Sequence, residues 1–295
     1  MKEARRRDEA GSHGSLESGD LPDQVPNAGL RDLQLVELSI LREFVRLCEA
    51  QGLRYYLAYG TLLGAVRHRG FIPWDDDIDV TMPRGDYNRF AEICASEVRP
   101  GFRWQSYSTD RHYPFLFGKL LRDDTVLRQA PTEQLPFQQS VCIDIFPLDG
   151  GAESAWAALA QRLIVRICRM RLGVGIRRRP LRRHLVQLTW AIPRSFAISV
   201  FEAMTRVVPA DRSAQWICVG GPYGHRRQSI PRHWFGSGTG QVFEDLTVVG
   251  PVRWDKYLAQ LYGDYMTPPP RQDRVSLHKV TEVRLGDLAP KDTGA

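Results

Sequence analysis

Large apolar side chains first recur at helical spacing beyond Asp32. They lie three or four positions apart, at Leu33, Val36, Ile40, Phe44 and Leu47. This spacing predicts an amphipathic helix, and Gly52, just past its end, is the residue type that most readily ends a helix. The preceding residues 1–30 are rich in Gly, Ser and charged residues and almost lack large apolar side chains, which predicts a disordered tail.

The pattern then changes to short β-type runs separated by short helical segments. We expect strands over 55–59, from Ile78 onward, and over 102–108, 114–122, 125–129 and 140–146. Helices are expected over 62–68, 86–98 and 254–263, two or three more over 152–208, and a hairpin over 241–252. The order predicts an α+β fold with a mixed β-sheet core flanked by helices over 31–150, a basic helical insert over 151–210 and a small C-terminal α+β cap over 211–295.

Composition and charge narrow the classes of protein that this chain can belong to. A hydrophobic content of 43% over 295 residues excludes a wholly disordered chain. The net charge is +6, but ten arginines and no acid lie between Ser154 and Phe201, so this stretch carries +10 and the remainder −4. A mildly acidic body with one basic segment argues against a nucleic-acid-binding protein.

The cysteines and the apolar runs indicate the cellular compartment in which the protein is expected. The five cysteines are far apart, without the spacing of a zinc site or a redox pair, which favours a reducing compartment. The N-terminus has no apolar signal segment, and the longest apolar run, 185–201, is interrupted by Pro193 and Arg194. We therefore expect a cytoplasmic protein without a transmembrane helix.

The candidate chemistry begins with four carboxylates within five residues, at Asp75, Asp76, Asp77 and Asp79. Such a density of negative charge on a folded surface favours a divalent cation, Mg²⁺ or Mn²⁺. In a strand from Ile78, side chains alternate, so Asp77 and Asp79 would point to the same side and hold metal. The sequence does not assign separate roles to Asp75 and Asp76: one of them caps a turn while the other orients a ligand.

A further carboxylate, Asp144, lies inside the apolar run VCIDIF. Burying an acid there is unfavourable unless it is paired or coordinates a metal. If its strand lies beside the strand of Asp77 and Asp79, the three acids converge. The alternative is a structural hydrogen bond from Asp144 to a neighbouring loop.

A phosphate-binding turn is predicted at Gly60 and Thr61, which follow a strand and open a helix. The backbone N–H groups at such a helix start bind anions. Arg67, at the end of that helix, would reach the same anion. Lys119 either contacts phosphates or lines a strand edge, and His278 either contacts substrate or is a solvent-exposed side chain.

Three segments together resemble one protein family. The run GTLLGAVRHRGFIPWDDDIDV, the motif IDIFPLDG at 143–150, and YGDYMTPPP with the following His278 are similar to the LicD family of the nucleotidyltransferase superfamily, which includes fukutin and fukutin-related protein. The resemblance covers about 32–278 and implies a nucleotidyltransferase-like core. It implies metal-dependent transfer of a phosphocholine- or phosphoribitol-type group from a CDP-linked donor to a glycan hydroxyl of a cell-surface polysaccharide, teichoic acid or lipopolysaccharide.

The resemblance also implies roles for individual residues. Asp77, Asp79 and Asp144 fall on the catalytic, metal-binding acids, and Gly60 and Thr61 on the phosphate-binding turn. Arg67, Lys119 and His278 complete the predicted substrate-binding residues. The cofactor would be Mg²⁺ or Mn²⁺.

Two other functions remain alternatives at this stage. One is transfer of a nucleotidyl group itself to a small molecule or an RNA end. The other is a non-catalytic basic module that binds membrane or nucleic acid, which the three acids argue against. The expected partners are a CDP-linked donor, a lipid-linked glycan acceptor and, through residues 162–184, the inner face of a membrane. The alternative for these arginines is that they pair with the acidic body or shape the acceptor pocket for an anionic glycan.

Overall fold

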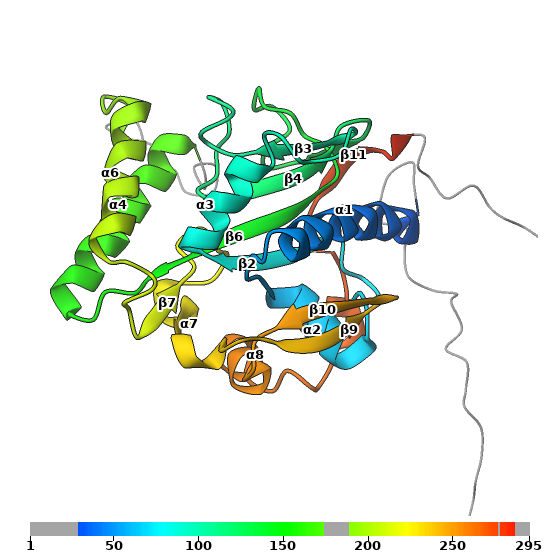
Figure 1. Ribbon diagram of the computed structural model, residues 1–295. Helices are drawn as coiled ribbons and strands as arrows, with labels where there is room; N and C mark the ends of the chain where they lie inside the picture. The colour runs from blue at the N-terminus through cyan, green and yellow to red at the C-terminus, as the bar shows by residue number, and fades with distance from the viewer. Residues whose placement is uncertain (1–28, 174–188, 277, 287–295) are drawn as a thin grey trace, which may run out of the picture.

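The computed structural model of the chain describes residues 29–173, 189–276 and 278–286. A mixed sheet occupies the centre, with the strand order β1 (Tyr56–Leu57), β2 (Asp79–Pro83), β6 (Cys142–Gly150), β4 (Gly118–Arg122) and β3 (Phe102–Gln105) (Figure 1). Strands β2 and β6 run parallel, and the other neighbours in this order are antiparallel. The predicted mixed α+β architecture is confirmed.

Further strands extend this framework. The end of β6 pairs with β7 (Gln215–Ile217), which pairs with β8 (Ser229–Pro231). Two small antiparallel sheets join β5 (Val126–Gln129) to β11 (Val280–Arg284), and β9 (Thr239–Phe243) to β10 (Leu246–Gly250). Segments expected to form a C-terminal cap therefore add strands to both β5 and β6 of the expected core.

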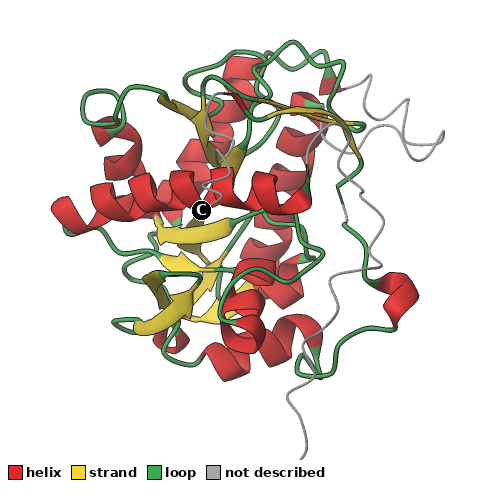
Figure 2. Cartoon of the chain, turned by 90° about the vertical axis from the view of Figure 1, so that its right-hand side faces the viewer, coloured by secondary structure: helices red, strands yellow, loops and turns green. Residues whose placement is uncertain are grey.

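Helices pack against the sheet from more than one side (Figure 2). The longer helices are α1 (Leu30–Ala50), α2 (Tyr59–His68), α3 (Arg84–Ile93), α4 (Ala155–Leu172), α6 (Arg194–Val207) and α8 (Trp254–Tyr262). A short helix α7 (His225–Gln228) and the 3-10 turns η1 (Arg232–Trp234) and η2 (Arg271–Asp273) lie in the C-terminal third. Helices α4 and α6 form a pair at one end of the molecule, away from α8 (Figure 1).

The first helix forms where the apolar spacing predicts it. Its face of Leu33, Ile40, Leu41, Phe44 and Leu47 is completely buried. Phe44 contacts Phe90 of α3 with ring centroids 5.0 Å apart, so α1 and α3 pack together on the sheet. Burying these side chains removes apolar surface from water, which is the main stabilising contribution of the helix.

Several predicted strands are shorter or longer than the sequence suggests. The strand expected over 55–59 ends at Leu57, because Tyr59 adopts a positive φ of 45° and begins α2. The strand expected over 102–108 ends at Gln105, where the Thr109 hydroxyl accepts a hydrogen bond from the backbone N–H of Ser106 and stabilises a turn. Strand β6 instead continues to Gly150, since β7 pairs with its last residues.

Part of the predicted organisation lies outside the described residues. This holds for residues 1–28 of the expected tail and for the arginines at 177–179, 182 and 183 of the expected basic insert. In the part of the chain that the structure describes, no helix is both long and apolar enough to cross a membrane.

Candidate active site

A cavity of about 540 Å³ opens between the start of α2, the loop before β2 and the C-terminal segment around 262–278. Its acids are Asp75, Asp77, Asp79, Asp264 and Asp273, and its aromatic residues are Tyr59, Trp74, Tyr223, Tyr262 and Tyr265. Gly60, Arg67 and His278 also line it. The cavity therefore combines carboxylates, one imidazole and one guanidinium with aromatic walls, a composition typical of a small-molecule site.

The beginning of α2 is tied directly to the beginning of β2. The backbone N–H of Asp79 donates to the Thr61 hydroxyl over 2.8 Å, and the Ala58 N–H donates to the Asp79 carbonyl over 3.0 Å. Thr61 is only 3% exposed, so its hydroxyl holds the Asp79 backbone from behind the cavity. The predicted phosphate-binding threonine thus has a positioning role in this structure.

Gly60 has a steric role at the same point. A Cβ atom there would lie 2.6 Å from Oδ2 of Asp75, closer than carbon and oxygen can approach. Glycine therefore lets the Asp75 carboxylate lie against the first turn of α2. The Asp75 backbone is held in turn by α1, because Gln34 Nε2 donates to the Asp75 carbonyl over 2.9 Å.

The sheet brings Asp79 and Asp144 together. They are direct partners in the parallel β2–β6 pairing, and the Asp144 N–H donates to the Ile78 carbonyl over 2.8 Å. Partner residues on adjacent strands direct their side chains to the same face of the sheet. The sequence predicts that three acids converge if these strands are neighbours. The strands are neighbours and bring Asp79 and Asp144 together, while Asp77 lies in the loop before β2.

A second group of ligand-type side chains forms around Asp77. His278 Nδ1 lies 3.0 Å from Oδ1 of Asp76 and 3.8 Å from Oδ2 of Asp77. The three side chains offer ligand atoms within 4.8 Å of one another. His278 reaches this position because β11, which begins two residues later, pairs with β5.

The carboxylates of the site strongly perturb one another. Burial, followed by repulsion from neighbouring aspartates, raises the pKa of Asp75 and of Asp79 well above the ordinary value. Burial also raises the pKa of Asp77, although the nearby His278 opposes it. For His278, burial lowers the pKa, but the hydrogen bond with Asp76 and the charge of Asp77 outweigh it and raise the pKa to about 9.

The residues around Asp77 fit a divalent metal ion. Oδ2 of Asp76 is buried without a hydrogen-bond partner within the described residues, and the carboxylates nearby repel one another. Carboxylate oxygens suit Mg²⁺ and Mn²⁺, and a neutral imidazole is a further ligand for transition metals. This set shares Asp77 with the predicted metal acids and adds Asp76 and His278, whereas Asp79 and Asp144 lie beside it on the sheet.

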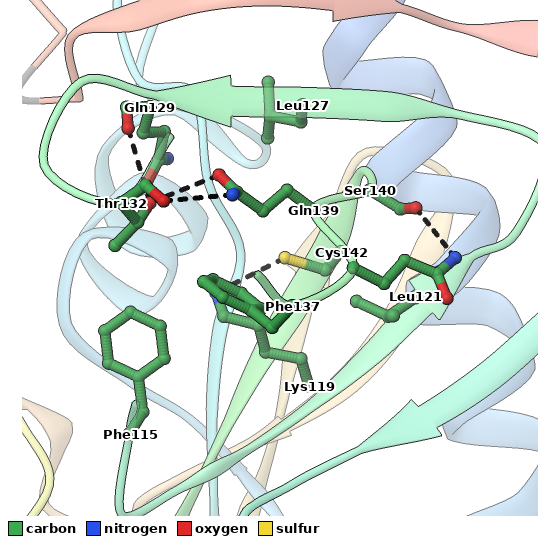
Figure 3. Close-up of a pocket in the computed structure, with 11 residues that line it drawn as sticks. Phe115, Lys119, Leu121, Leu127, Gln129, Thr132, Phe137, Gln139, Ser140 and Cys142 are labelled. Carbon is green, nitrogen blue, oxygen red and sulfur yellow. Dashed lines mark hydrogen bonds between the residues drawn. The ribbon is translucent and has the colours of Figure 1, made fainter. Parts of the chain in front are cut away.

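Lys119 lies outside the large cavity. Its ammonium forms an ion pair with Oδ1 of Asp144 at 2.5 Å and donates to Cys142 Sγ at 3.4 Å. The Asp144 charge outweighs the effect of burial and raises the pKa of Lys119. It lines a smaller cavity of about 30 Å³ together with Phe115, Phe137 and Cys142 (Figure 3). Lys119 therefore contacts the third acid rather than the space for a donor.

Arg67 lines the large cavity as predicted, and its Nη1 donates to the Tyr265 carbonyl over 3.0 Å. This bond ties α2 to the segment 262–270 that forms the opposite wall. The residue-level predictions missed Tyr223, Tyr262, Asp264 and Tyr265. The available signal for the last three was the motif YGDYMTPPP, in which they are embedded.

Comparison with known proteins identifies the family of this chain. The family model described as LicD/FKTN/FKRP, nucleotidyltransferase domain matches residues 52–149, which contain α2, β2 and all of β6 except its last residue. Lipopolysaccharide cholinephosphotransferase LicD of Haemophilus influenzae is 30% identical over 259 residues, covering 84% of this chain and 96% of that protein. The chain belongs to the LicD family.

More distant similarity is confined to a short region. Human ribitol 5-phosphate transferase FKRP is 38% identical over 77 residues, which are 23% of this chain and 16% of that protein. An uncharacterized protein of Rickettsia prowazekii, RP689, is 35% identical over 81 residues, or 28% of each chain. The shared region is therefore much shorter than the match to the Haemophilus protein.

Proposed function

We propose that this protein is a metal-dependent phosphotransferase that moves a phosphocholine- or phosphoribitol-type group from a CDP-linked donor to a glycan hydroxyl. The observation that carries the proposal is the cavity in which Asp75, Asp77, Asp79 and His278 face aromatic walls and Arg67. Family membership supports the reaction class, because two relatives are named as a cholinephosphotransferase and a ribitol 5-phosphate transferase.

The metal would be held by Asp76, Asp77 and His278, with Asp79 beside them. A bound Mg²⁺ or Mn²⁺ would neutralise donor phosphate charge and stabilise the charge that develops during transfer. The protein's own contribution is to fix the neighbouring acids Asp75 and Asp79 before the donor arrives. Gly60 admits Asp75 to the site, and the Thr61 hydroxyl holds the Asp79 backbone.

Donor binding follows from the remaining walls of the cavity. The guanidinium of Arg67 would bind a phosphate oxygen, and the N-terminus of α2 adds backbone N–H groups. The rings of Tyr223, Tyr262 and Tyr265 would cover the base or the transferred group. Aromatic faces also attract a quaternary ammonium group, which suits a choline-bearing donor.

We assign Asp144 to proton transfer. The acceptor hydroxyl oxygen forms a bond to the β-phosphorus of the donor while the bond to the CMP oxygen breaks, and the hydroxyl proton passes to Asp144. The ion pair with Lys119 holds the Asp144 carboxylate in a fixed orientation. Asp144, the acid of the IDIF motif, lies on the same face of the sheet as Asp79.

The test is product analysis with purified protein. CDP-choline, CDP-ribitol and CDP-glycerol are each incubated with Mg²⁺ or Mn²⁺ and a glycan acceptor, and products are identified by mass spectrometry. Release of CMP with mass gain on the acceptor is expected, and chelation by EDTA should stop it. Release of pyrophosphate from a nucleoside triphosphate, with no CMP from any CDP-linked donor, would instead establish nucleotidyl transfer.

A further inference from the structure

Helix α4 has two apolar faces, and only one of them is covered. Toward the interior, Cys168 is buried and Ile164, Val165 and Leu172 pack with it against α6 and its neighbours. On the opposite side are Trp156, Leu159 and Leu163, with exposed fractions of 82%, 51% and 55%. These last three residues are called the outer stripe below.

The outer stripe is a continuous feature of the helix surface. Its members are three and four positions apart, so their side chains lie on one line along the helix. A helix face in water is normally polar, and large exposed apolar groups that cluster usually mark an interaction surface. Phe196 of α6 is also 60% exposed, and Trp190, which lies before α6 in the chain, is 66% exposed.

The charged side chains of α4 itself all have the same sign. Arg162 and Arg166 are exposed, lie one helical turn apart and follow one edge of the outer stripe. Helix α4 contains four arginines and no acid, even in its first turn, where an acid would interact favourably with the helix dipole. A partner that covers this surface therefore has to accept both apolar side chains and several positive charges.

We propose that the outer stripe of α4 docks on an anionic lipid surface. Trp156, Leu159 and Leu163 enter the boundary between headgroups and acyl chains, while Arg162 and Arg166 bind lipid phosphates. Amphipathic helices with arginines beside an apolar face bind membranes in this way, with a tryptophan at the interface. Ile164 and Leu172, on the other face of α4, pack against the protein interior and take no part in this surface.

Charge complementarity selects lipid as the occupant. Anionic headgroups present phosphate at high density over a flat surface, which matches arginines spaced along a helix without counter-charges. The outer stripe is also distant in the fold from the cavity of Asp77, since its helix packs on α6 at the other end of the molecule (Figure 1). This inference goes beyond the proposed function and does not depend on it.

The experiment is flotation of the full chain with vesicles. Vesicles of phosphatidylcholine mixed with phosphatidylglycerol are compared with pure phosphatidylcholine, at low and high salt and without donor. The wild type should float with the anionic vesicles and dissociate partly at high salt. The triple variant Trp156→Ser, Leu159→Ser, Leu163→Ser should bind at least tenfold more weakly, and the double variant Arg162→Gln, Arg166→Gln should lose the preference for anionic lipid.

A matched control removes exposed apolar groups elsewhere. Val242→Ser, Val252→Ser and Met266→Ser change side chains that are 39%, 42% and 55% exposed, and this variant should float like the wild type. Thermal melts verify folding, and the single variants Leu159→Ser and Leu163→Ser are used if the triple variant unfolds. Equal flotation of wild type and stripe variants would overturn the proposal. Failure of the wild type to float would also overturn the proposal. This includes the case in which the outer stripe mediates self-association, detected as an oligomer by size-exclusion chromatography.

Discussion

Adjacent residues in the acidic run have different surroundings. The Asp76 side chain is 1% exposed and hydrogen-bonded to His278, whereas the neighbouring Asp77 is 28% exposed and opens into the cavity. Asp76 and Asp77 both precede β2, so the loop before this strand sets the direction of each side chain. Asp77 is therefore more accessible to metal and donor than Asp76.

The first prediction concerns this residue. Asp77→Asn removes a ligand charge at the centre of the site while keeping nearly the same volume. We expect kcat for CMP release to fall by about 10²-fold or more, with the melting temperature unchanged or raised, because a repelled carboxylate has been removed. Steady-state kinetics and differential scanning fluorimetry measure the two effects.

The control for this variant is Asp245→Asn. Asp245 is 63% exposed and pairs with Arg42 at the surface, so its loss should leave kcat unchanged. If Asp77→Asn retains the wild-type rate with saturating metal, the metal site is elsewhere.

Helix α1 provides a second prediction at this scale, through two buried glutamates with opposite surroundings. Burial and the nearby aspartates raise the pKa of Glu37 well above its ordinary value of 4.5, and its Oε2 has no partner within the described residues. For Glu43, burial opposes ionisation, but Arg46 and the Arg99 backbone lower the pKa. Glu37 should thus destabilise the fold at neutral pH and Glu43 stabilise it.

The pH dependence of the free energy of unfolding distinguishes the effect of Glu37 from that of Glu43. Unfolded Glu37 releases its proton above about pH 4.5 while the folded form retains it, so wild-type stability falls as pH rises. Glu37→Gln should therefore gain stability over wild type by up to about 1.4 kcal/mol per pH unit above that value, and match it at low pH. Glu43→Gln should be less stable at neutral pH, and this loss should disappear on acidification.

Urea unfolding at several pH values gives these differences directly. A Glu37→Gln protein that is less stable than wild type at neutral pH would show that Glu37 is ionised and paired. Loss of activity without loss of stability would instead assign Glu37 to the site.

At the scale of elements, one ion pair joins α3 to the end of β6. Arg84 Nε and Asp149 Oδ1 lie 2.6 Å apart, Nη2 and Oδ2 2.8 Å apart, and the side chains are 12% and 1% exposed. Arg84 starts α3 directly after β2, so the pair fastens the parallel β2–β6 unit at the end opposite Asp79 and Asp144. The register that brings those two acids together depends on this unit.

The prediction for this pair is a loss of stability. Asp149→Asn leaves the Arg84 charge buried without its partner, which should lower the free energy of unfolding by about 3–5 kcal/mol. The matched control is Asp123→Asn, which breaks an exposed bidentate pair with Arg103 and should lower it by at most about 1 kcal/mol. Chemical denaturation compares the two; equal effects would show that the Arg84–Asp149 pair is not important for stability.

For the whole molecule, the proposed metal site should link metal binding to folding. Its walls come from α2, from the loop before β2 and from the C-terminal segment that ends with His278. A ligand that binds only the assembled site stabilises the folded state by mass action. The metal should therefore connect segments that are 202 positions apart in the chain, as Asp76 and His278 are.

The last prediction follows from this linkage. Mg²⁺ or Mn²⁺ at 100 times its Kd should stabilise the folded wild type by about 2.7 kcal/mol and raise the melting temperature by a few degrees, while His278→Ala should respond less and Asp77→Asn hardly at all. EDTA should reverse the shift. A metal-induced shift of the same size in Asp77→Asn would show that the ion binds outside this site.

The amino-acid sequence alone was sufficient for the elements whose pattern is local. The apolar spacing of α1, the β9–β10 hairpin and α8 depends on neighbouring residues, and the structure has all three where they were expected. The acidic run and Asp144 were also identifiable, because a buried or crowded carboxylate is unfavourable without a partner. Gly60 was identifiable because it follows a strand and opens a helix.

Only the tertiary structure decided which of these residues meet. The β2–β6 register places Asp79 beside Asp144, and the β5–β11 pairing brings His278 to Asp76, contacts between positions that are 65 and 202 apart in the chain. The tertiary structure also directs the Thr61 hydroxyl to the Asp79 backbone and pairs the Lys119 ammonium with the Asp144 carboxylate. Sequence periodicity reports which face a side chain occupies on its own element, whereas pairing between distant strands depends on the packing of the whole chain.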